Sequence, residues 1–164
     1  VEALSLADRI AVMRAGKILQ VEDTSRIYDK PDHVFVASFL GSPPMNLIKG
    51  DFEDIGGEVM FKKGEFHLPV AADIKEGRYT LGVRPESIRV TSRDEALLKG
   101  DVTLVEPRGS EVVLTVDVNK QLLKIVAPSI DYPAEGERIG VAVDMESLVF
   151  FGGDTNRRVD LCAA

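Results

Sequence analysis

The first residues that could do chemistry lie around Pro85, in the segment Leu81-Gly82-Val83-Arg84-Pro85-Glu86. A proline keeps the residue before it in an extended conformation, so Arg84 is held extended and projects from the end of a strand together with Glu86. An arginine and a glutamate fixed in this way suit recognition or an interface. A structural role in turning the chain is nevertheless favoured over ligand binding.

A second candidate group surrounds Pro107 and Gly109. Proline and glycine interrupt a strand there and present Glu106, Arg108 and Ser110 at a loop, where they could hold an anion or a partner protein. For this group too, linking strands is the favoured role. The candidate regulatory or interface residues are therefore Arg84, Glu86, Glu106, Arg108 and Ser110.

No arrangement typical of catalysis occurs in the sequence. A phosphate loop needs an earlier glycine and a following hydroxyl around Gly16-Lys17, and both are missing. His33 and His67 have no metal-ligand spacing, and surface or capping positions are expected for them. The single cysteine, Cys162, allows no internal disulfide and is expected to be an incidental thiol. We predict no catalytic, cofactor-binding or metal-binding residues, and no enzymatic activity for this chain.

Composition limits the class of protein. The 164 residues are 45% hydrophobic and 29% charged, as in a folded globular chain, and no apolar run is long enough to span a membrane. The formal net charge is −7, with 6% aromatic residues and no tryptophan. Nucleic acid is an unsuitable partner, because binding it requires basic grooves and stacking aromatic side chains.

The first 40 residues have mixed α/β character. Apolar spacing over 2–9 predicts a short helix, and two apolar runs, 10–13 and 18–21, predict a hairpin that turns at Gly16. Capping oxygens at 23–25 predict a helical turn through Tyr28, and Pro31 is expected to begin a helix that ends before Gly41. Gly41-Ser42-Pro43-Pro44 marks the predicted boundary between the domains 1–40 and 41–164.

The region after Pro44 is predicted to be rich in β-strands. Short apolar segments alternate with glycine, proline, asparagine and aspartate, as in small sandwiches and barrels. The clearest hairpin pairs 111–118 with 121–126 across the turn Asn119-Lys120. The predicted strands are 45–50, 57–61, 65–69, 78–83, 87–91, 101–106, 111–118, 121–127, 138–144 and 147–151. The predicted fold class is mainly β: a small OB-like antiparallel barrel preceded by a short α/β piece.

Several motifs resemble one family. VEALSLADRIAVM at 1–13, followed by AGKI at 15–18, resembles the segment after the switch histidine in the ATP-binding subunits of ABC-type sugar importers, of the maltose, glycerol-3-phosphate and multiple-sugar group. The likeness continues through IYDKP at 27–31, FVASFLGSP at 35–43 and Met45-Asn46. It extends to GVRPE at 82–86, VEP at 105–107, GSE at 109–111, and Phe151 with Asp154-Thr155.

The resemblance implies a C-terminal fragment in which 1–40 completes a nucleotide-binding domain and 41–164 forms the regulatory OB-like (TOBE) domain. It implies that the ATP-hydrolysing motifs, with ATP and Mg²⁺, belong to a full-length parent that drives sugar import. The implied partners are a second copy in a homodimer, permease subunits that span the membrane, and a regulatory protein. The implied location is the cytoplasm, peripheral to the inner face of the cell membrane.

The sequence leaves one alternative open. A free-standing barrel could sense an oxyanion or a sugar phosphate through Arg84, Arg108 and Ser110. The chain lacks the Ser-Ala-Arg-Asn-type marker of related molybdate-binding modules.

Overall fold

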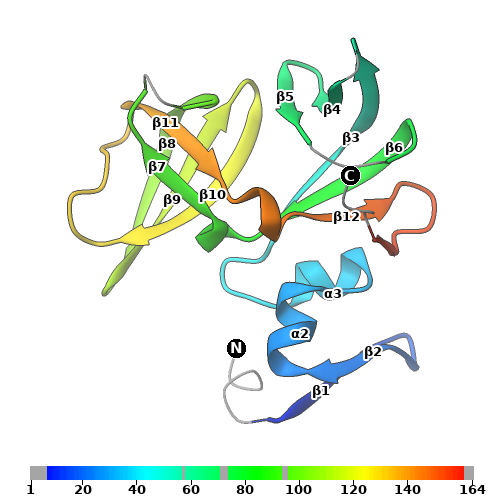
Figure 1. Cartoon of the computed structure of the whole chain (residues 1–164). Coiled ribbons are helices and arrows are strands. Elements are labelled where there is room, and N and C mark those ends of the chain that lie inside the picture. Colours follow the sequence, from blue (N-terminus) through cyan, green and yellow to red (C-terminus); the bar gives the residue numbers. More distant parts are fainter. Residues whose placement is uncertain (1–6, 57, 71–73, 94–95, 161–164) are drawn as a thin grey trace.

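The computed structural model describes residues 7–56, 58–70, 74–93 and 96–160 (Figure 1). The chain begins with the predicted hairpin, in which β1 (Arg9–Arg14) pairs antiparallel with β2 (Lys17–Asp23). Ala15 and Gly16 form the turn with φ values of 49° and 76°, as a two-residue hairpin turn of the mirror-image type requires. The helix predicted over 2–9 lies largely outside the described residues, and Arg9 already belongs to β1.

Two short helices follow the hairpin. Helix α2 (Thr24–Asp29) agrees with the predicted helical turn, although its N-cap residue Asp23 makes no capping hydrogen bond with its side chain. Helix α3 (Val34–Phe39) begins three residues later than predicted, because its N-cap residue is His33 and Pro31 lies before the helix. The His33 Nδ1 accepts a hydrogen bond of 2.9 Å from the Phe35 N–H, which confirms the capping position expected for this histidine.

The remaining strands form two antiparallel sheets. The six-stranded sheet has the order β13-β12-β6-β3-β4-β5, and the five-stranded sheet has the order β10-β9-β8-β11-β7. The first contains β3 (Asn46–Ile55), β4 (Glu58–Lys63), β5 (Phe66–Pro69), β6 (Gly77–Val83), β12 (Val149–Gly152) and β13 (Arg158–Val159). The second contains β7 (Ile88–Thr91), β8 (Leu98–Arg108), β9 (Glu111–Val118), β10 (Gln121–Pro128) and β11 (Arg138–Val143). Short 3-10 helices, η1 (Pro85–Ser87) and η2 (Met145–Ser147), precede β7 and β12.

The predicted hairpin between β9 and β10 is confirmed, with Gln121 paired to Val118 and positive φ at Asn119 and Lys120. Val112, Leu114 and Val116 of β9 are buried on one face of the strand, and Val113 is buried on the other. The mainly β, antiparallel fold class is also confirmed. The described residues add the two-residue strand β13, which the sequence pattern did not predict.

One hydrophobic core joins the two sheets. Buried residues of the six-stranded sheet, including Phe52, Phe61 and Phe150, belong to the same cluster as Val112 and Leu114 of the five-stranded sheet. The ring of Phe52 makes edge-to-face contacts with both phenylalanines at centroid distances of 5.4 and 5.1 Å. The two sheets therefore share one core and form a single β-rich part, residues 45–160.

The N-terminal segment, residues 7–40, has a small core of its own and lies against the β-rich part, below the sheets in Figure 1. The contact is a second apolar group, the junction cluster, in which α3 meets β3 and β12. Its members are Val34, Ala37, Met45, Leu47, Val149 and Phe151. Neither helix in the described part of the chain is long enough to cross a membrane.

Candidate functional site

Arg84 stands at the junction of the N-terminal segment and the β-rich part. It follows β6 and is only 4% exposed. Its Nη1 donates to the Leu40 carbonyl at 2.7 Å, and its Nη2 and Nε donate to the Tyr28 carbonyl at 2.5 and 3.2 Å. One guanidinium from the β-rich part therefore binds the ends of both α2 and α3.

Both the helix ends and the strand end explain why Arg84 lies at the junction. The last carbonyls of a helix lack partners within the helix and carry partial negative charge, so a cation stabilises them. On the strand side, Arg84 is extended, with φ −69° and ψ 142°, and Pro85 opens η1, as the proline predicted. Burial lowers the pKa of Arg84, and the neighbouring Tyr28 and Glu86 oppose that shift. The guanidinium remains charged because an arginine pKa lies far above neutrality.

Tyr28 connects Arg84 to Glu86. The guanidinium carbon of Arg84 lies 3.7 Å from the centre of the Tyr28 ring, which is a cation–π contact. The Tyr28 hydroxyl donates a hydrogen bond of 2.7 Å to Glu86 Oε1. Burial and this hydrogen bond raise the pKa of Tyr28 to about 12, so the phenol is neutral at physiological pH. The structure thus brings the predicted pair Arg84 and Glu86 together through a tyrosine that sequence reasoning had not assigned to the site.

The second predicted group lies on β8 and the turn that follows it. Arg108 Nη2 lies 3.8 Å from Glu106 Oε1, and its Nη1 donates to Ser42 Oγ at 3.3 Å. Glu106 also pairs with Lys124 at 3.4 Å. Half-exposed ion pairs of this kind contribute little stability. The carbonyl of Ser110 accepts a hydrogen bond of 3.0 Å from the Ser129 N–H, which closes the loop. Both predicted groups thus touch the connection between the two parts, at Leu40 and at Ser42.

Asn46 is a structural residue that sequence reasoning did not single out by chemistry. Its Oδ1 accepts from the Lys124 N–H at 2.7 Å, and its Nδ2 donates to the Lys124 carbonyl at 2.9 Å. The same Nδ2 lies 3.3 Å from the Val83 carbonyl. The amide therefore imitates a strand neighbour and joins β3 to β10, the edge of the other sheet. The only sequence signal was its place in the Met45-Asn46 pair.

A third contact holds the start of α3. The Val34 N–H donates to the Asn156 carbonyl at 3.0 Å, and the Arg158 N–H donates to the Asp32 carbonyl at 2.9 Å. The Arg158 guanidinium also pairs with the Asp32 carboxylate at 3.1 Å. We call residues 156–158 the C-terminal strap, because they fix the N-terminal end of α3 while Arg84 fixes its C-terminal end.

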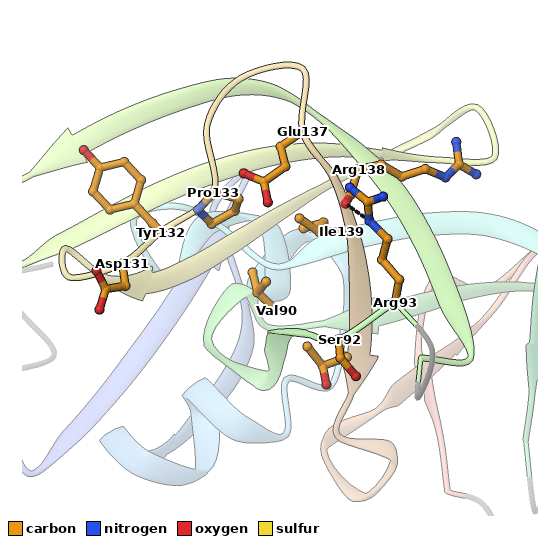
Figure 2. Close-up of a pocket in the computed structure, with 10 residues that line it drawn as sticks. Val90, Ser92, Arg93, Asp131, Tyr132, Pro133, Glu137, Arg138 and Ile139 are labelled. Atoms are coloured by element: carbon orange, nitrogen blue, oxygen red, sulfur yellow. Dashed lines mark hydrogen bonds between the residues drawn. The ribbon is translucent and has the colours of Figure 1, made fainter.

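A surface pocket of about 420 Å³ lies elsewhere, between the end of β7 and the segment before β11 (Figure 2). Its lining residues are Val90, Thr91, Ser92, Arg93, Asp131, Tyr132, Pro133, Glu137, Arg138 and Ile139. In Figure 2 Arg93 reaches the carbonyl of Arg138, to which its Nε donates, and the guanidinium of Arg138 extends away. Glu137 accepts from the Ala134 N–H at 3.1 Å. None of the five predicted site residues lines this pocket.

Within 7–56, 58–70, 74–93 and 96–160, no three histidine, cysteine, aspartate or glutamate side chains are placed to hold a metal ion together. Cys162 lies outside the described residues.

Comparison with protein families defines the class. Residues 41–88 match the MalK OB fold domain, and residues 81–151 match the TOBE domain. Together the two matches cover 41–151, most of the region that the motifs assigned to a single OB-like (TOBE) domain, 41–164.

The relatives identify the kind of protein that carries these domains. The sn-glycerol-3-phosphate import ATP-binding protein UgpC of Cupriavidus necator is 35% identical over 98% of this chain and 46% of its own length. The alpha-glucoside transport ATP-binding protein AglK of Rhizobium meliloti is 35% identical over 95% of the chain and 44% of its length. The xylose/arabinose import ATP-binding protein XacJ of Haloferax volcanii is 34% identical over 97% and 46%. The chain is related to ATP-binding subunits of ABC sugar importers, matches their C-terminal regions, and spans about half their length.

Proposed function

We propose that this chain is the regulatory and dimerisation part of the ATP-binding subunit of an ABC sugar importer, and that it does not itself hydrolyse ATP. One observation carries the proposal: Arg84 of the β-rich part binds the ends of both helices of the N-terminal segment. A movement of the β-rich part is therefore passed to that segment, and through it to a nucleotide-binding domain of which the segment is the last piece.

Exposed apolar residues support the link to a larger nucleotide-binding domain. Met13 and Ile18 of the hairpin are 56% and 59% exposed, and Phe39 at the end of α3 is 66% exposed. Folded monomers rarely leave large apolar side chains together on one small segment unless a partner covers them. In the proposed parent, the preceding part of the subunit covers this surface and supplies the residues that bind ATP and Mg²⁺.

The proposal extends to the partners and the location. The subunit would work in the cytoplasm, on the inner face of the membrane, with permease subunits that span it. The relatives' names, which refer to import or transport of sn-glycerol-3-phosphate, alpha-glucoside and xylose or arabinose, favour a sugar or a sugar phosphate as the transported substrate. A regulatory protein would act by binding one arrangement of the paired subunits more tightly than the other.

Light scattering over a range of concentrations tests dimerisation. We expect the mass to rise from that of one chain, 17.9 kDa, towards twice that value as concentration increases. A mass of 17.9 kDa at every concentration would refute the dimerisation proposal. In parallel, the purified chain should release no phosphate from ATP in the presence of Mg²⁺, and measurable turnover above a buffer control would refute the non-enzymatic assignment.

The alternative of a free-standing anion sensor has less support. It relied on Arg84, whose three donor nitrogens bind protein carbonyls in a buried position. Calorimetry with molybdate, sulfate and sugar phosphates distinguishes the two functions. Saturable heat that Arg108→Met abolishes would support the sensor over the regulatory part.

A further inference from the structure

We infer that Arg84 is the positioning residue that sets the orientation of the N-terminal segment on the β-rich part, and that a planar guanidinium is required for this. The three hydrogen bonds and the ring contact converge on one side chain that is 4% exposed. They join three separate elements, α2, α3 and β6, at one point. A single group of this kind fixes an angle between elements, which a general apolar contact does not do.

The chemistry of the junction selects arginine. The carbonyls of Tyr28 and Leu40 must be reached while the charged group lies 3.7 Å from the centre of the Tyr28 ring. A guanidinium is flat and carries its donors around its edge, so it can stack on a ring and bind two carbonyls in the same plane. A lysine ammonium is a compact, strongly hydrated group on a flexible stem, and it lacks this geometry.

The backbone at Gly41 supports the same conclusion independently. Gly41 has a φ of +103°, a conformation that favours glycine. A Cβ at this position would lie 3.1 Å from Arg84 Nη1 and 3.0 Å from the Pro43 carbonyl oxygen. The chain therefore closes tightly around the guanidinium immediately after α3, and a side chain at 41 would press directly on it.

The other contacts at the junction leave one motion open. The C-terminal strap binds the first residues of α3 through Asp32 and Val34. The junction cluster is apolar, and its attraction is not directional. Without Arg84, the exposed Tyr28–Glu86 hydrogen bond still joins α2 to η1, but the C-terminal end of α3 loses the hydrogen bond at the Leu40 carbonyl and can pivot about the strap, which carries α2 with it. Arg84 is the second fixed point that stops this rotation.

Distances between two spin labels test the inference on the full chain. Cys162→Ser removes the single native cysteine, and Ser25→Cys on α2 with Lys99→Cys on β8 introduces labels at two exposed positions. We expect one narrow distance with Arg84 present. With Arg84→Lys, the distribution should broaden about twofold or split, because more than one orientation is populated.

The matched control is Arg138→Lys, the same substitution at an arginine of the β-rich part that pairs with Asp101. It should leave the distance distribution unchanged. Gly41→Ala keeps Arg84 but places a Cβ 3.1 Å from its Nη1 and 3.0 Å from the Pro43 carbonyl oxygen, so its broadening supports the inference only together with broadening in Arg84→Lys. A narrow, unshifted distance in both Arg84→Lys and Gly41→Ala would overturn the inference, as would equal broadening in Arg138→Lys.

This inference is independent of dimerisation. Dilution of labelled chains into unlabelled chains confines the measurement to distances within one molecule. A strictly monomeric chain whose orientation depends on Arg84 would refute the proposed dimer and still support the positioning role.

Discussion

Asn46 offers the sharpest test of how the two sheets are held together. Its side-chain amide supplies one acceptor and one donor to the backbone of Lys124, at 2.7 and 2.9 Å, and a longer contact to the Val83 carbonyl. Asn46→Ala removes all three contacts and leaves the Lys124 N–H and carbonyl without this partner. Each hydrogen bond contributes about 1 kcal/mol, and each partly buried group left unpaired costs more, so we expect a loss of about 2 to 4 kcal/mol.

Urea unfolding followed by circular dichroism measures this loss. Small proteins have denaturant slopes of about 1 to 3 kcal/mol per molar urea, so the midpoint should fall by about 1 to 2 M with an unchanged slope. The matched control is Gln121→Ala, which removes a side-chain amide from β10, the strand that contains Lys124. The Gln121 Oε1 accepts a hydrogen bond from the exposed Lys63 ammonium. Such a surface change should stay within about 0.5 kcal/mol.

Asn46→Asp adds a test of the hydrogen-bond geometry. The aspartate keeps an acceptor for the Lys124 N–H but turns a second oxygen towards the Lys124 and Val83 carbonyls. Protonation restores a donor, so the folded-state pKa of this carboxyl should lie above its ordinary value of about 3.9. A carboxyl whose pKa is raised in the folded state contributes its full stability below its unfolded-state pKa and loses it as pH rises through the folded-state pKa. The loss of unfolding free energy in Asn46→Asp, relative to the natural chain, should therefore be smaller at pH 4 than at pH 7. Equal midpoints for Asn46→Ala and Gln121→Ala, or a deficit independent of pH, would refute the bridging role.

Three further predictions concern other parts of the chain. The pKa of Tyr28 is raised to about 12, so its contribution to stability should be complete below about pH 10 and lost as pH rises to about 12; Tyr28→Phe should remove the corresponding step from an absorbance titration at 295 nm. Gly140→Ala would place a Cβ 2.3 Å from the Ser92 carbonyl oxygen, and this backbone clash should cost about 1 to 3 kcal/mol in urea unfolding. Phe151→Ala empties a fully buried position of the junction cluster and should cost about 3 to 5 kcal/mol, with faster amide exchange in α3; unchanged exchange there would contradict the proposed packing.

Local pattern was sufficient for most strands. The alternation of Val112, Leu114 and Val116 with the intervening residues Val113, Thr115 and Asp117 predicted β9, and Asn119-Lys120 predicted its turn. Both signals act over a few residues, through side-chain direction and backbone sterics. The predicted start of α3, at Pro31, was wrong by three residues. Proline is compatible with the first turn of a helix but does not determine where the helix begins. The helix begins after His33, because His33 Nδ1 accepts a hydrogen bond from the Phe35 N–H.

The candidate site was predicted only in part. Proline chemistry indicated that Arg84 projects from a strand end, but its partners, Tyr28 and Leu40, lie 56 and 44 residues away in sequence. No periodicity links positions so far apart. The C-terminal strap, where Arg158 meets Asp32 across 126 residues, and the two-residue strand β13 gave no sequence signal at all.

By itself, the sequence determined the class of the chain, because its motifs, strand periodicity and turn residues are local patterns that can be recognised without the fold. Only the tertiary structure decided what Arg84, Asn46 and Arg158 do. A buried hydrogen bond between distant residues exists only after packing has brought a donor and an acceptor within about 3 Å and excluded water from them. The junction that the proposed function needs therefore results from packing. The sequence gives the types of the residues that form it, but only the folded structure shows which of them contact each other.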